Sequence, residues 1–250
     1  ALRYYEREVR FYRDIAPLAP LNTPLCYHGA FDPATGDAVL VLEDVADVTP
    51  GDDLDGCPPD RAAQVVERLA ALHAGYWGRY GQPGLEWLPR FDQDQPDVFF
   101  ERVWRKMAIR HRHTLPADFP PIAEELCTRL PAFRARMSQA PLTVAHGDVR
   151  TDNLLFTAAG VTFVDWQLVE WARGPLDLGY FLTQSFHPDD RRQQEAALFD
   201  RYYAGLTAHG VRGYSRDDCW QDYRLGVLQN ACTFILAGGF DRDGAEKALA

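Results

Sequence analysis

Two short polar segments, each bounded by apolar residues, constrain the fold of this chain more than any other feature. The first, residues 144–156, reads VAHGDVRTDNLLF and places His, Gly, Asp and Asn between two hydrophobic runs. The second, residues 160–167, reads GVTFVDWQ and is a β-branched and aromatic strand that leads into a carboxylate. Small residues and a glycine at 157–160 predict the turn that joins them as a hairpin. Polar residues held between buried segments predict a rigid loop, where site residues commonly lie.

The polar residue types of this hairpin suit phosphoryl transfer. That reaction needs a group that orients the attacking hydroxyl and accepts its proton, and hard oxygen ligands for magnesium. Asp148 is the candidate for the first task, and Asn153 and Asp165 are the candidates for the second. Asp148 and Asn153 have the spacing of the protein-kinase loop H-R-D-x-x-x-x-N, with Gly147 in place of the arginine. Asp165 stands where the aspartate of D-F-G would stand, although a Trp and a Gln follow it.

In this order, the two motifs resemble those of the aminoglycoside phosphotransferase and choline kinase-like superfamily. The pattern continues with GPLDLGYFL at residues 174–182, and is most similar to the ecdysteroid kinase-like branch and its bacterial relatives. The resemblance extends from about residue 5 to about residue 240. It implies a protein-kinase-like, two-lobed α+β fold and the ATP- and Mg²⁺-dependent phosphorylation of a hydroxyl group on a small molecule. Asp and Asn in a loop are also common turn formers, so the first motif alone would be weak support.

The resemblance also implies supporting roles for residues outside the catalytic positions. Asp177 is expected to accept hydrogen bonds from backbone N–H groups of the catalytic loop and to fix its shape. His146 is expected to have a similar supporting role. Glu8, with Glu6 as the weaker alternative, matches the helix glutamate that pairs with a strand lysine, which in turn holds the α and β phosphates of ATP.

Three further positions concern contacts with the nucleotide. Glu43 and Val45 match the hinge between the lobes, where main-chain groups meet the adenine. Arg150 lies inside the catalytic loop, where it would either contact phosphate or neutralise Asp148. The sequence does not choose between these two roles for Arg150.

The beginning of the chain departs from the pattern of the family. A strand with the lysine and a glycine-rich strand pair should precede the helix of Glu8, but only seven residues precede it and none is Lys. The chain is therefore either a fragment that lacks the first part of its N-terminal lobe or an intact protein without the usual nucleotide clamp. Because the helical pattern starts at the first residues without a capping residue, we expect a fragment.

Hydrophobic periodicity and turn residues divide the chain into two expected lobes. Residues 1–45, the remainder of the N-terminal lobe, should form a helix and then a hairpin that ends at the hinge. Residues 46–250 should form a mostly helical C-terminal lobe. The expected elements are a helix at 2–15, strands at 25–31 and 38–42, a linker at 46–59, and helices capped by Asp60, beginning near 99, and at 121–138, 191–210 and 217–239.

Two features of the C-terminal lobe have a structural and a functional interpretation. His73 lies on a predicted helix, and we expect it to pack in the core instead of binding a ligand. Residues 78–98 form a Gly-, Pro- and Asp-rich insertion of the kind that often shapes a substrate site. Asp92, Asp94 and Asp97 in this insertion would attract a cation, but we expect them to be surface charges.

Composition limits the classes of partner. With 46% hydrophobic and 12% aromatic residues the chain can bury a core, so disorder is not expected. A net charge of −10 argues against a general nucleic-acid binder, and is compatible with a cationic substrate or simply with solubility. The five Cys are scattered and include no C-x-x-C pair, which is typical of free thiols in a reducing compartment. No apolar run is long enough to span a membrane, and no signal peptide is visible. The sequence therefore predicts a cytoplasmic protein that is not in a membrane. The sequence does not indicate an oligomeric state.

Two alternatives to the kinase function remain open at this point. One is a catalytically degenerate kinase-fold protein that binds a nucleotide or a metabolite. The other is a different magnesium-dependent reaction, such as slow hydrolysis of ATP. The acceptor is also open, because an aromatic and aliphatic lining would favour a lipophilic alcohol and an acidic lining would favour an aminoglycoside or a choline-like cation.

Overall fold

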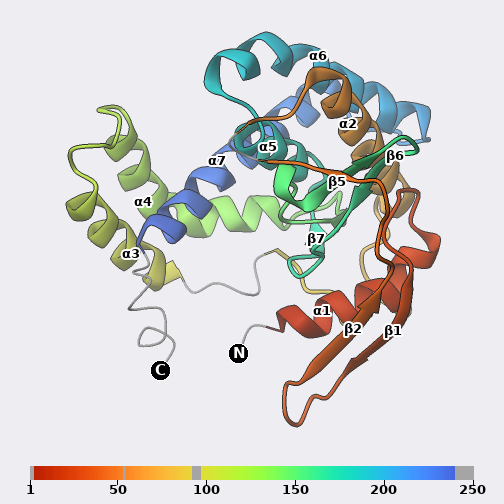
Figure 1. The fold of residues 1–250 in the computed structure, drawn as a ribbon. Coiled ribbons are helices and arrows are strands. Elements are labelled where there is room, and N and C mark those ends of the chain that lie inside the picture. Colours follow the sequence, from red (N-terminus) through yellow and green to blue (C-terminus); the bar gives the residue numbers. More distant parts are fainter. Residues whose placement is uncertain (1–2, 53–54, 92–96, 240–250) are drawn as a thin grey trace.

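The computed structural model of the chain describes residues 3–52, 55–91 and 97–239. A small unit of one helix and one hairpin lies beside a larger, mainly helical unit (Figure 1). The helices are α1 (Tyr4–Arg10), α2 (Pro59–Tyr76), α3 (Asp97–Arg110), α4 (Phe119–Met137), α5 (Pro175–Gln184), α6 (Pro188–Ala208) and α7 (Arg216–Gly239). The strands are β1 (Cys26–Phe31), β2 (Ala38–Leu42), β3 (Thr49–Pro50), β4 (Thr143–Ala145), β5 (Leu154–Thr157), β6 (Gly160–Phe163) and β7 (Glu170–Ala172).

The small unit has the helix and the hairpin that the sequence predicts. Helix α1 continues through a π-helical segment, Phe11–Ile15, and a single 3₁₀ turn that contains Pro17. Strands β1 and β2 pair antiparallel, with Phe31 opposite Ala38 at the turn. Val9 of α1 is buried against this hairpin, because α1 lies across it. The predicted boundary at residue 45 falls between β2 and β3 and stays a prediction.

A second hairpin, β5–β6, carries the two motifs and is the centre of the fold. Leu154 pairs with Phe163, and Thr157 pairs with Gly160 at the predicted turn. The alternate residues Leu154, Phe156, Val161 and Phe163 are buried, so the hairpin is held on one face by the main core. Strand β3 adds to its edge, which the sequence did not predict because the strand has two residues and one is a proline.

A third strand pair, β4–β7, brings the entrance of the catalytic loop next to the segment that follows Asp165. Thr143 pairs with Ala172 and Ala145 with Glu170. Backbone hydrogen bonds then connect Trp171 of β7 with Pro89 and Phe91 of the predicted insertion. The described part of this insertion therefore packs beside the site, while Asp92 and Asp94 lie outside the described residues.

The helices of the larger unit pack around these strands as two hydrophobic clusters. One combines α2, α5, α6 and the first part of α7 with β5 and β6, and the other combines α3 and α4 with the last part of α7. Helices α5 and α7 approach closely because both have a glycine at the contact. A Cβ atom at Gly179 would lie 2.6 Å from the backbone of Gly226.

Some expected helix boundaries are wrong. Helix α2 begins at Pro59, its N-cap position is Pro58, and no side chain caps it, so Asp60 lies in the first turn and is not the N-cap. Helix α6 begins at Pro188, where a proline at the first position suits a helix start, and not at residue 191. Within the described residues, no helix combines the length and the apolar composition that crossing a membrane requires.

Candidate active site

The loop between β4 and β5 is fixed by hydrogen bonds to the side chain of Asp177, near the start of α5. One carboxylate oxygen of Asp177 accepts the backbone N–H of His146 at 2.7 Å, and the other accepts that of Gly147 at 2.9 Å. The side chain of Asp177 is fully buried. One carboxylate thus satisfies the N–H groups of two successive residues of the tight loop. The resemblance to the kinase-like family implies these hydrogen bonds for Asp177.

A third donor to Asp177 comes from helix α2, which no sequence motif connects with the site. His73 of α2 is fully buried, as expected, and its Nε2 lies 3.1 Å from the Asp177 carboxylate. Its Nδ1 lies 2.7 Å from the hydroxyl of Tyr202 on α6, and its carbonyl accepts the hydroxyl of Thr143 on β4. His73 therefore connects α2, α5, α6 and β4 beneath the loop, a role that no local pattern in the sequence indicates.

These contacts keep the Asp177 carboxylate charged. Burial alone would raise its pKa, because a charge is poorly solvated in the interior. The hydrogen bond from His73, the electrostatic interactions with the rings of His73 and His146, and the N–H of Gly147 oppose burial more strongly, and together they hold the pKa of Asp177 below its ordinary value. The loop is thus fixed by an ionised carboxylate over the usual working range of pH.

The imidazole of His146 joins the two motifs. Its Nδ1 accepts the backbone N–H of Asp148 at 3.2 Å, so the proton of the neutral ring lies on Nε2. That Nε2 donates to the carbonyl of Val164, directly before Asp165, at 3.1 Å. The ring is fully buried and lies 4.3 Å from the ring of Trp166, centroid to centroid. With both ring nitrogens used, His146 is placed to support the loop and not to transfer protons.

The glycine of the loop is required by a close backbone approach. Gly147 has φ = +84°, and a Cβ atom there would lie 2.5 Å from the carbonyl oxygen of Leu168. Both the left-handed conformation and the contact exclude a larger residue. This explains why Gly stands where the protein-kinase motif has Arg.

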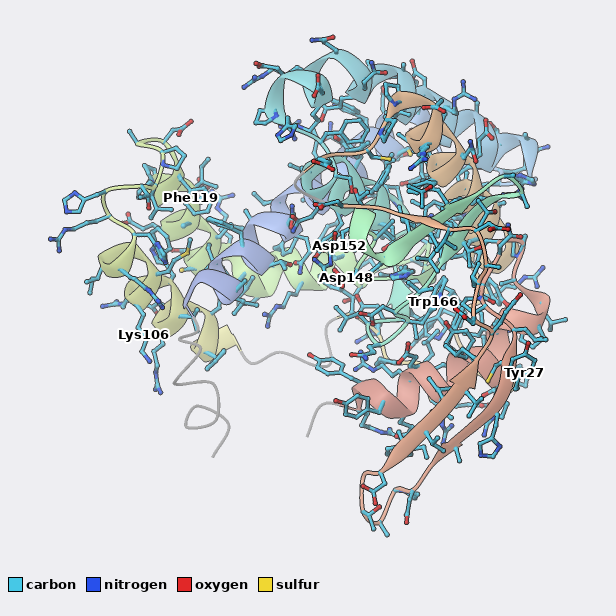
Figure 2. The ribbon with its side chains drawn as sticks, in the orientation of Figure 1. Tyr27, Lys106, Phe119, Asp148, Asp152 and Trp166 are labelled. Carbon is cyan, nitrogen blue, oxygen red and sulfur yellow. The ribbon has the colours of Figure 1, made fainter. Side chains whose placement is uncertain are left out.

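Asp148 follows at the open end of the loop, near the middle of the molecule (Figure 2). Its side chain is 18% exposed. The side-chain amide of Asn153 donates to its Oδ2 at 3.0 Å and to its backbone carbonyl at 2.9 Å. The amide nitrogen of Asn153 therefore faces Asp148, which turns its oxygen toward the opposite side. Arg150 completes the surroundings, with Nε 3.6 Å from Oδ2 of Asp148.

Asp165 is placed beside Asn153 by the hairpin. The N–H of Val164 donates to the carbonyl of Asn153 at 3.1 Å, so the residue after Val164 leaves the strand at the end of the catalytic loop. Asp165 itself has φ = +62°, which is uncommon for a residue other than glycine and often marks a functional turn. The following Trp166 is fully buried and anchors this turn.

The donor atoms at this position fit Mg²⁺. The ion prefers oxygen ligands and commonly uses one or two protein carboxylates together with phosphate oxygens and water. An amide oxygen and a carboxylate, from Asn153 and Asp165, are such a set. Among the described residues, no group of three or more His, Cys, Asp or Glu side chains is placed to hold a metal ion.

Glu8 and Glu6 of α1 have different surroundings. Glu8 faces the second motif, where its carboxylate accepts the N–H of Trp166 and lies 3.5 Å from the amide nitrogen of Gln167. Burial and the nearby charge of Asp165 raise the pKa of Glu8. Glu6 instead pairs with arginines of its own helix region, at 2.5 Å from Arg3 and 2.9 Å from Arg10. The geometry thus selects Glu8 over Glu6 as the glutamate near the catalytic hairpin.

Of the two expected hinge residues, Glu43 is engaged with the first hairpin. The N–H of Glu43 donates to the carbonyl of Leu25 at 2.8 Å, and its side chain accepts the N–H of Leu25 at 3.0 Å. A nucleotide at the hinge would therefore have to meet the carbonyl of Glu43 or the backbone of Val45. Their contact with adenine stays a prediction.

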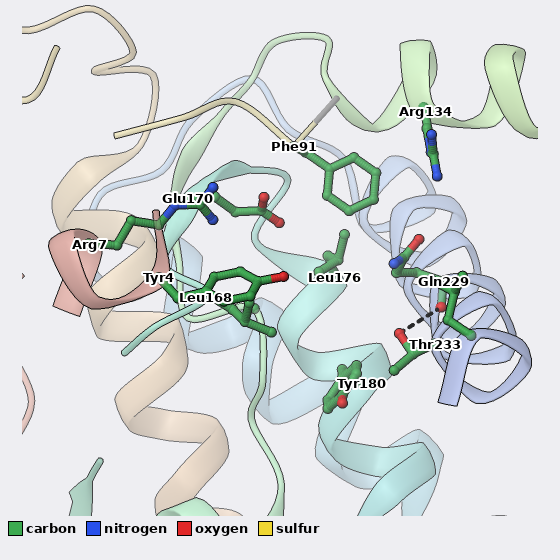
Figure 3. A pocket seen from close by; sticks show the side chains of 12 residues that line it. Tyr4, Arg7, Phe91, Arg134, Leu168, Glu170, Leu176, Tyr180, Gln229 and Thr233 are labelled. Atoms are coloured by element: carbon green, nitrogen blue, oxygen red, sulfur yellow. Dashed lines mark hydrogen bonds between the residues drawn. The ribbon is translucent and has the colours of Figure 1, made fainter. Parts of the chain in front are cut away.

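A cavity of about 140 Å³ opens beside the catalytic loop, between α1, α5 and α7 (Figure 3). Its lining combines aromatic and aliphatic side chains with charged and polar ones. Tyr180, one turn after Asp177, reaches from this cavity toward Asp148. Burial and the neighbouring Asp148 carboxylate raise the pKa of the Tyr180 phenol. The lining residues include Tyr4, Arg7, Phe91, Arg134, Leu168, Glu170, Leu176, Tyr180 and Thr233.

Known structures share this fold over most of the chain. A microcompartment-associated aminopropanol kinase is 16% identical, with a TM-score of 0.64 over 98% of this chain and 77% of that one. Choline kinase LicA from Streptococcus pneumoniae is 13% identical, with a TM-score of 0.58 over 97% and 75%. An aminoglycoside phosphotransferase from Streptomyces rimosus, in complex with ADP and streptomycin, is 16% identical, with a TM-score of 0.57 over 93% and 83%. At these identities the comparisons establish the fold, and the predicted kinase-like fold class is confirmed.

The sequence itself identifies the family. A comparison with curated proteins finds no match. The profile of the ecdysteroid kinase-like family matches residues 86–211, which is just over half of the chain and includes both motifs and Asp177. The resemblance predicted from the motifs is therefore confirmed, and the chain belongs to the ecdysteroid kinase-like family.

Proposed function

We propose that this protein transfers the γ-phosphoryl group of ATP to a hydroxyl group of a small molecule. The observation that carries the proposal is the convergence of Asp148, Asn153 and Asp165 around one loop, which the buried Asp177 carboxylate holds in shape. Membership of a family named for kinases, and a fold shared with choline, aminopropanol and aminoglycoside kinases, supports the reaction class.

In this proposal Asp148 orients the acceptor hydroxyl and takes its proton. The hydroxyl oxygen forms a bond to the γ-phosphorus as the bond from that phosphorus to the bridging oxygen breaks, and ADP leaves. Mg²⁺, held through Asn153 and Asp165, would neutralise charge on the phosphate groups. Asn153 has a second task, because its amide nitrogen fixes the Asp148 carboxylate at 3.0 Å. His146 and Asp177 support the loop and do not touch the reacting atoms.

The cavity beside the loop is the proposed acceptor site. Phe91, Leu168 and Leu176 form an apolar wall, and Arg7, Arg134 and Glu170 are its charged side chains. Two arginines and one glutamate do not make an acidic lining, so the cavity favours a largely apolar alcohol over a polycation. The sequence alone did not show whether the lining of the acceptor site is apolar or acidic.

The alternative, a kinase-fold protein that binds a nucleotide or metabolite without turnover, rests on one observation. Glu8 contacts Trp166 and Gln167 in the described residues, whereas the resemblance expects a lysine partner. Slow hydrolysis of ATP is a third outcome of the same site. The proposal includes three further predictions. The protein is cytoplasmic, it has no nucleic-acid or membrane partner, and the main chain at Glu43 and Val45 contacts adenine.

The test is an acceptor screen with ATP and Mg²⁺. Sterol-like alcohols, choline and amino sugars are incubated with the protein, and both ADP and the phosphorylated acceptor are measured by mass spectrometry. We expect Mg²⁺-dependent product with a neutral, largely apolar alcohol and less with the cations. ADP without any phosphorylated acceptor would support hydrolysis, and nucleotide binding without ADP would support the binding-protein alternative.

A further inference from the structure

Arg150 lies between two carboxylates at the mouth of the catalytic loop. Its Nε is 3.6 Å from Oδ2 of Asp148, and one terminal nitrogen is 3.1 Å from Oδ2 of Asp152. The side chain of Arg150 is 37% exposed, and that of Asp152 is 43% exposed. An ion pair with this much exposure contributes little to stability, so the guanidinium can leave Asp152 at small cost. Its contact with the less exposed Asp148 is longer, at 3.6 Å.

The position of the phosphoryl group follows from the proposed role of Asp148. A catalytic base lies about 2.6–3.2 Å from the hydroxyl oxygen that it deprotonates. That oxygen lies about 3–3.5 Å from the phosphorus that it attacks in a productive arrangement. A guanidinium that is already 3.6 Å from the Asp148 carboxylate is therefore within one side-chain movement of the oxygens on this phosphorus.

The negative charges around the transferred phosphoryl group favour a cationic side chain there. Asp148, Asp152 and Asp165 bring three carboxylates to the loop, and a triphosphate adds further negative charge. In the transition state, charge is spread over the three equatorial oxygens of the transferred group. Arginine remains protonated at any working pH, and its planar set of N–H donors matches phosphate oxygens in pairs.

We propose that Arg150 moves from its bridge between Asp148 and Asp152 to the transferred phosphoryl group and stabilises it during transfer. The inference rests on the proposed function and resolves the two roles that the sequence left open for Arg150. Neutralising Asp148 is then its resting state, and contact with phosphate is its catalytic state. A purely structural bridge would depend equally on its other partner, Asp152, which makes the two cases separable.

The experiment needs no knowledge of the acceptor. Binding of ADP–Mg²⁺ is measured by titration calorimetry with and without aluminium fluoride, which occupies the place of the transferred group. We compare the wild type with Arg150→Ala, Arg150→Lys and Asp152→Asn. Arg201→Ala is the control, because Arg201 forms an exposed ion pair with Glu67 elsewhere on the surface.

In the wild type, aluminium fluoride should tighten ADP binding. Arg150→Ala should bind ADP–Mg²⁺ alone with wild-type affinity. The increase in affinity that aluminium fluoride causes should be about 100-fold smaller than in the wild type, which is the usual effect of removing one donor to the transition state. Arg150→Lys should retain only part of the tightening, because a lysine lacks the paired donors. Asp152→Asn and Arg201→Ala should behave as the wild type.

Two results would contradict the role of Arg150 while leaving the proposed function intact. One is full tightening by aluminium fluoride in Arg150→Ala. The other is an equal loss in Asp152→Asn, which would make Arg150 a structural bridge. If the wild type does not bind ADP–Mg²⁺ at all, the proposed function itself fails, and the role of Arg150 fails with it. Thermal melts of each variant show whether the fold is retained.

Discussion

The ring of Phe11 lies flat against the indole of Trp166, with their centroids 3.8 Å apart and their planes 8° from parallel. Phe11 belongs to the helical segment that continues α1, and Trp166 directly follows the proposed metal ligand Asp165. Glu8, one turn earlier, accepts the backbone N–H of the same tryptophan. The helix of the small unit and the turn of Asp165 are therefore fixed to each other by two contacts.

Loss of the Phe11 ring should weaken both stability and metal-dependent binding. Phe11→Leu keeps an apolar side chain but removes the stacking, which contributes about 0.5–1.5 kcal/mol beyond burial. Because Asp165 then loses part of its support, Mg²⁺-dependent ADP binding should also weaken. The control is Phe100→Leu, since Phe100 is equally buried but lies in the cluster of α3, α4 and α7.

Denaturant unfolding and ADP titrations with and without Mg²⁺ measure the two effects. Both variants should be destabilised, and only Phe11→Leu should lose affinity that depends on the metal. Equal Mg²⁺-dependent affinity in the two variants would show that the stack does not position Asp165.

Replacing Asp177 should remove hydrogen bonds that fix the catalytic loop and should destabilise the fold. Asp177→Asn places an NH₂ group where two backbone N–H groups and His73 now donate, so at least one buried donor loses its partner. We expect the free energy of unfolding to fall by about 3 kcal/mol, as for other buried charges that lose a partner. Asp200→Asn is the control, because Asp200 is 57% exposed and pairs with Arg216.

The same variant should change the response to acid. Because the pKa of Asp177 is lowered in the folded state, its ionised form stabilises the fold above the ordinary value of 3.8. This contribution is lost as the pH falls through the lowered pKa. Asp177→Asn should therefore lose less stability than the wild type on acidification below 3.8, and an identical acid response in melting experiments would contradict the assignment.

Glu8 should have the opposite effect on the pH dependence of stability. Its pKa is raised in the folded state by burial and by Asp165, so the folded protein holds this proton more strongly than the unfolded chain does. Stability is then lost as the pH rises above the ordinary value of 4.5 and Glu8 ionises. Glu8→Gln removes this loss.

Melting temperatures without nucleotide, at pH 4.5 and at neutral pH, test this sign. Glu8→Gln should gain stability relative to the wild type at neutral pH and little at the lower pH. Glu101→Gln, at an exposed residue of α3 that pairs with Arg105, should show no such difference. A gain that is equal at both pH values would show that Glu8 is not titrating in this window.

The proposed acceptor cavity can be blocked without touching the catalytic loop. Thr233 of α7 lines the cavity, and Thr233→Phe should fill part of its volume of about 140 Å³. We expect kcat/KM for the acceptor to fall at least tenfold, a change of about 1.4 kcal/mol, while ADP–Mg²⁺ affinity is retained. Thr128→Phe on the exposed face of α4 is the control. Unchanged acceptor kinetics in Thr233→Phe would place the acceptor elsewhere.

The parts of the fold that sequence reasoning predicted are those with a local cause. The β5–β6 hairpin follows from two apolar segments joined by a small-residue turn, and the fold class follows from the order of the two motifs. Asp148, Asn153 and Asp165 come together because their spacing along this hairpin brings them to one end of it. Their individual roles stay predictions.

The parts that sequence reasoning missed depend on contacts across long distances in the chain. Nothing near His73 indicates that Asp177 and Tyr202 lie against its ring, since they are 104 and 129 residues away in the chain. Strand β7 has three residues, and its pairing partner β4 lies on the far side of the catalytic hairpin in sequence. Helix α5 begins at the proline of a Gly-Pro pair that resembles a turn, although a proline at the first position also suits a helix start.

The central claim is that Asp148 accepts the proton of an alcohol as ATP phosphorylates it. The most direct measurement is the rate of phosphoryl transfer from ATP by Asp148→Asn, with ADP–Mg²⁺ affinity measured on the same protein. Asp152→Asn, the same change four residues later in the loop, is the matched control. We predict that Asp148→Asn binds ADP–Mg²⁺ like the wild type and loses at least 100-fold in kcat, whereas Asp152→Asn retains turnover. Turnover by Asp148→Asn at the wild-type rate would contradict the account.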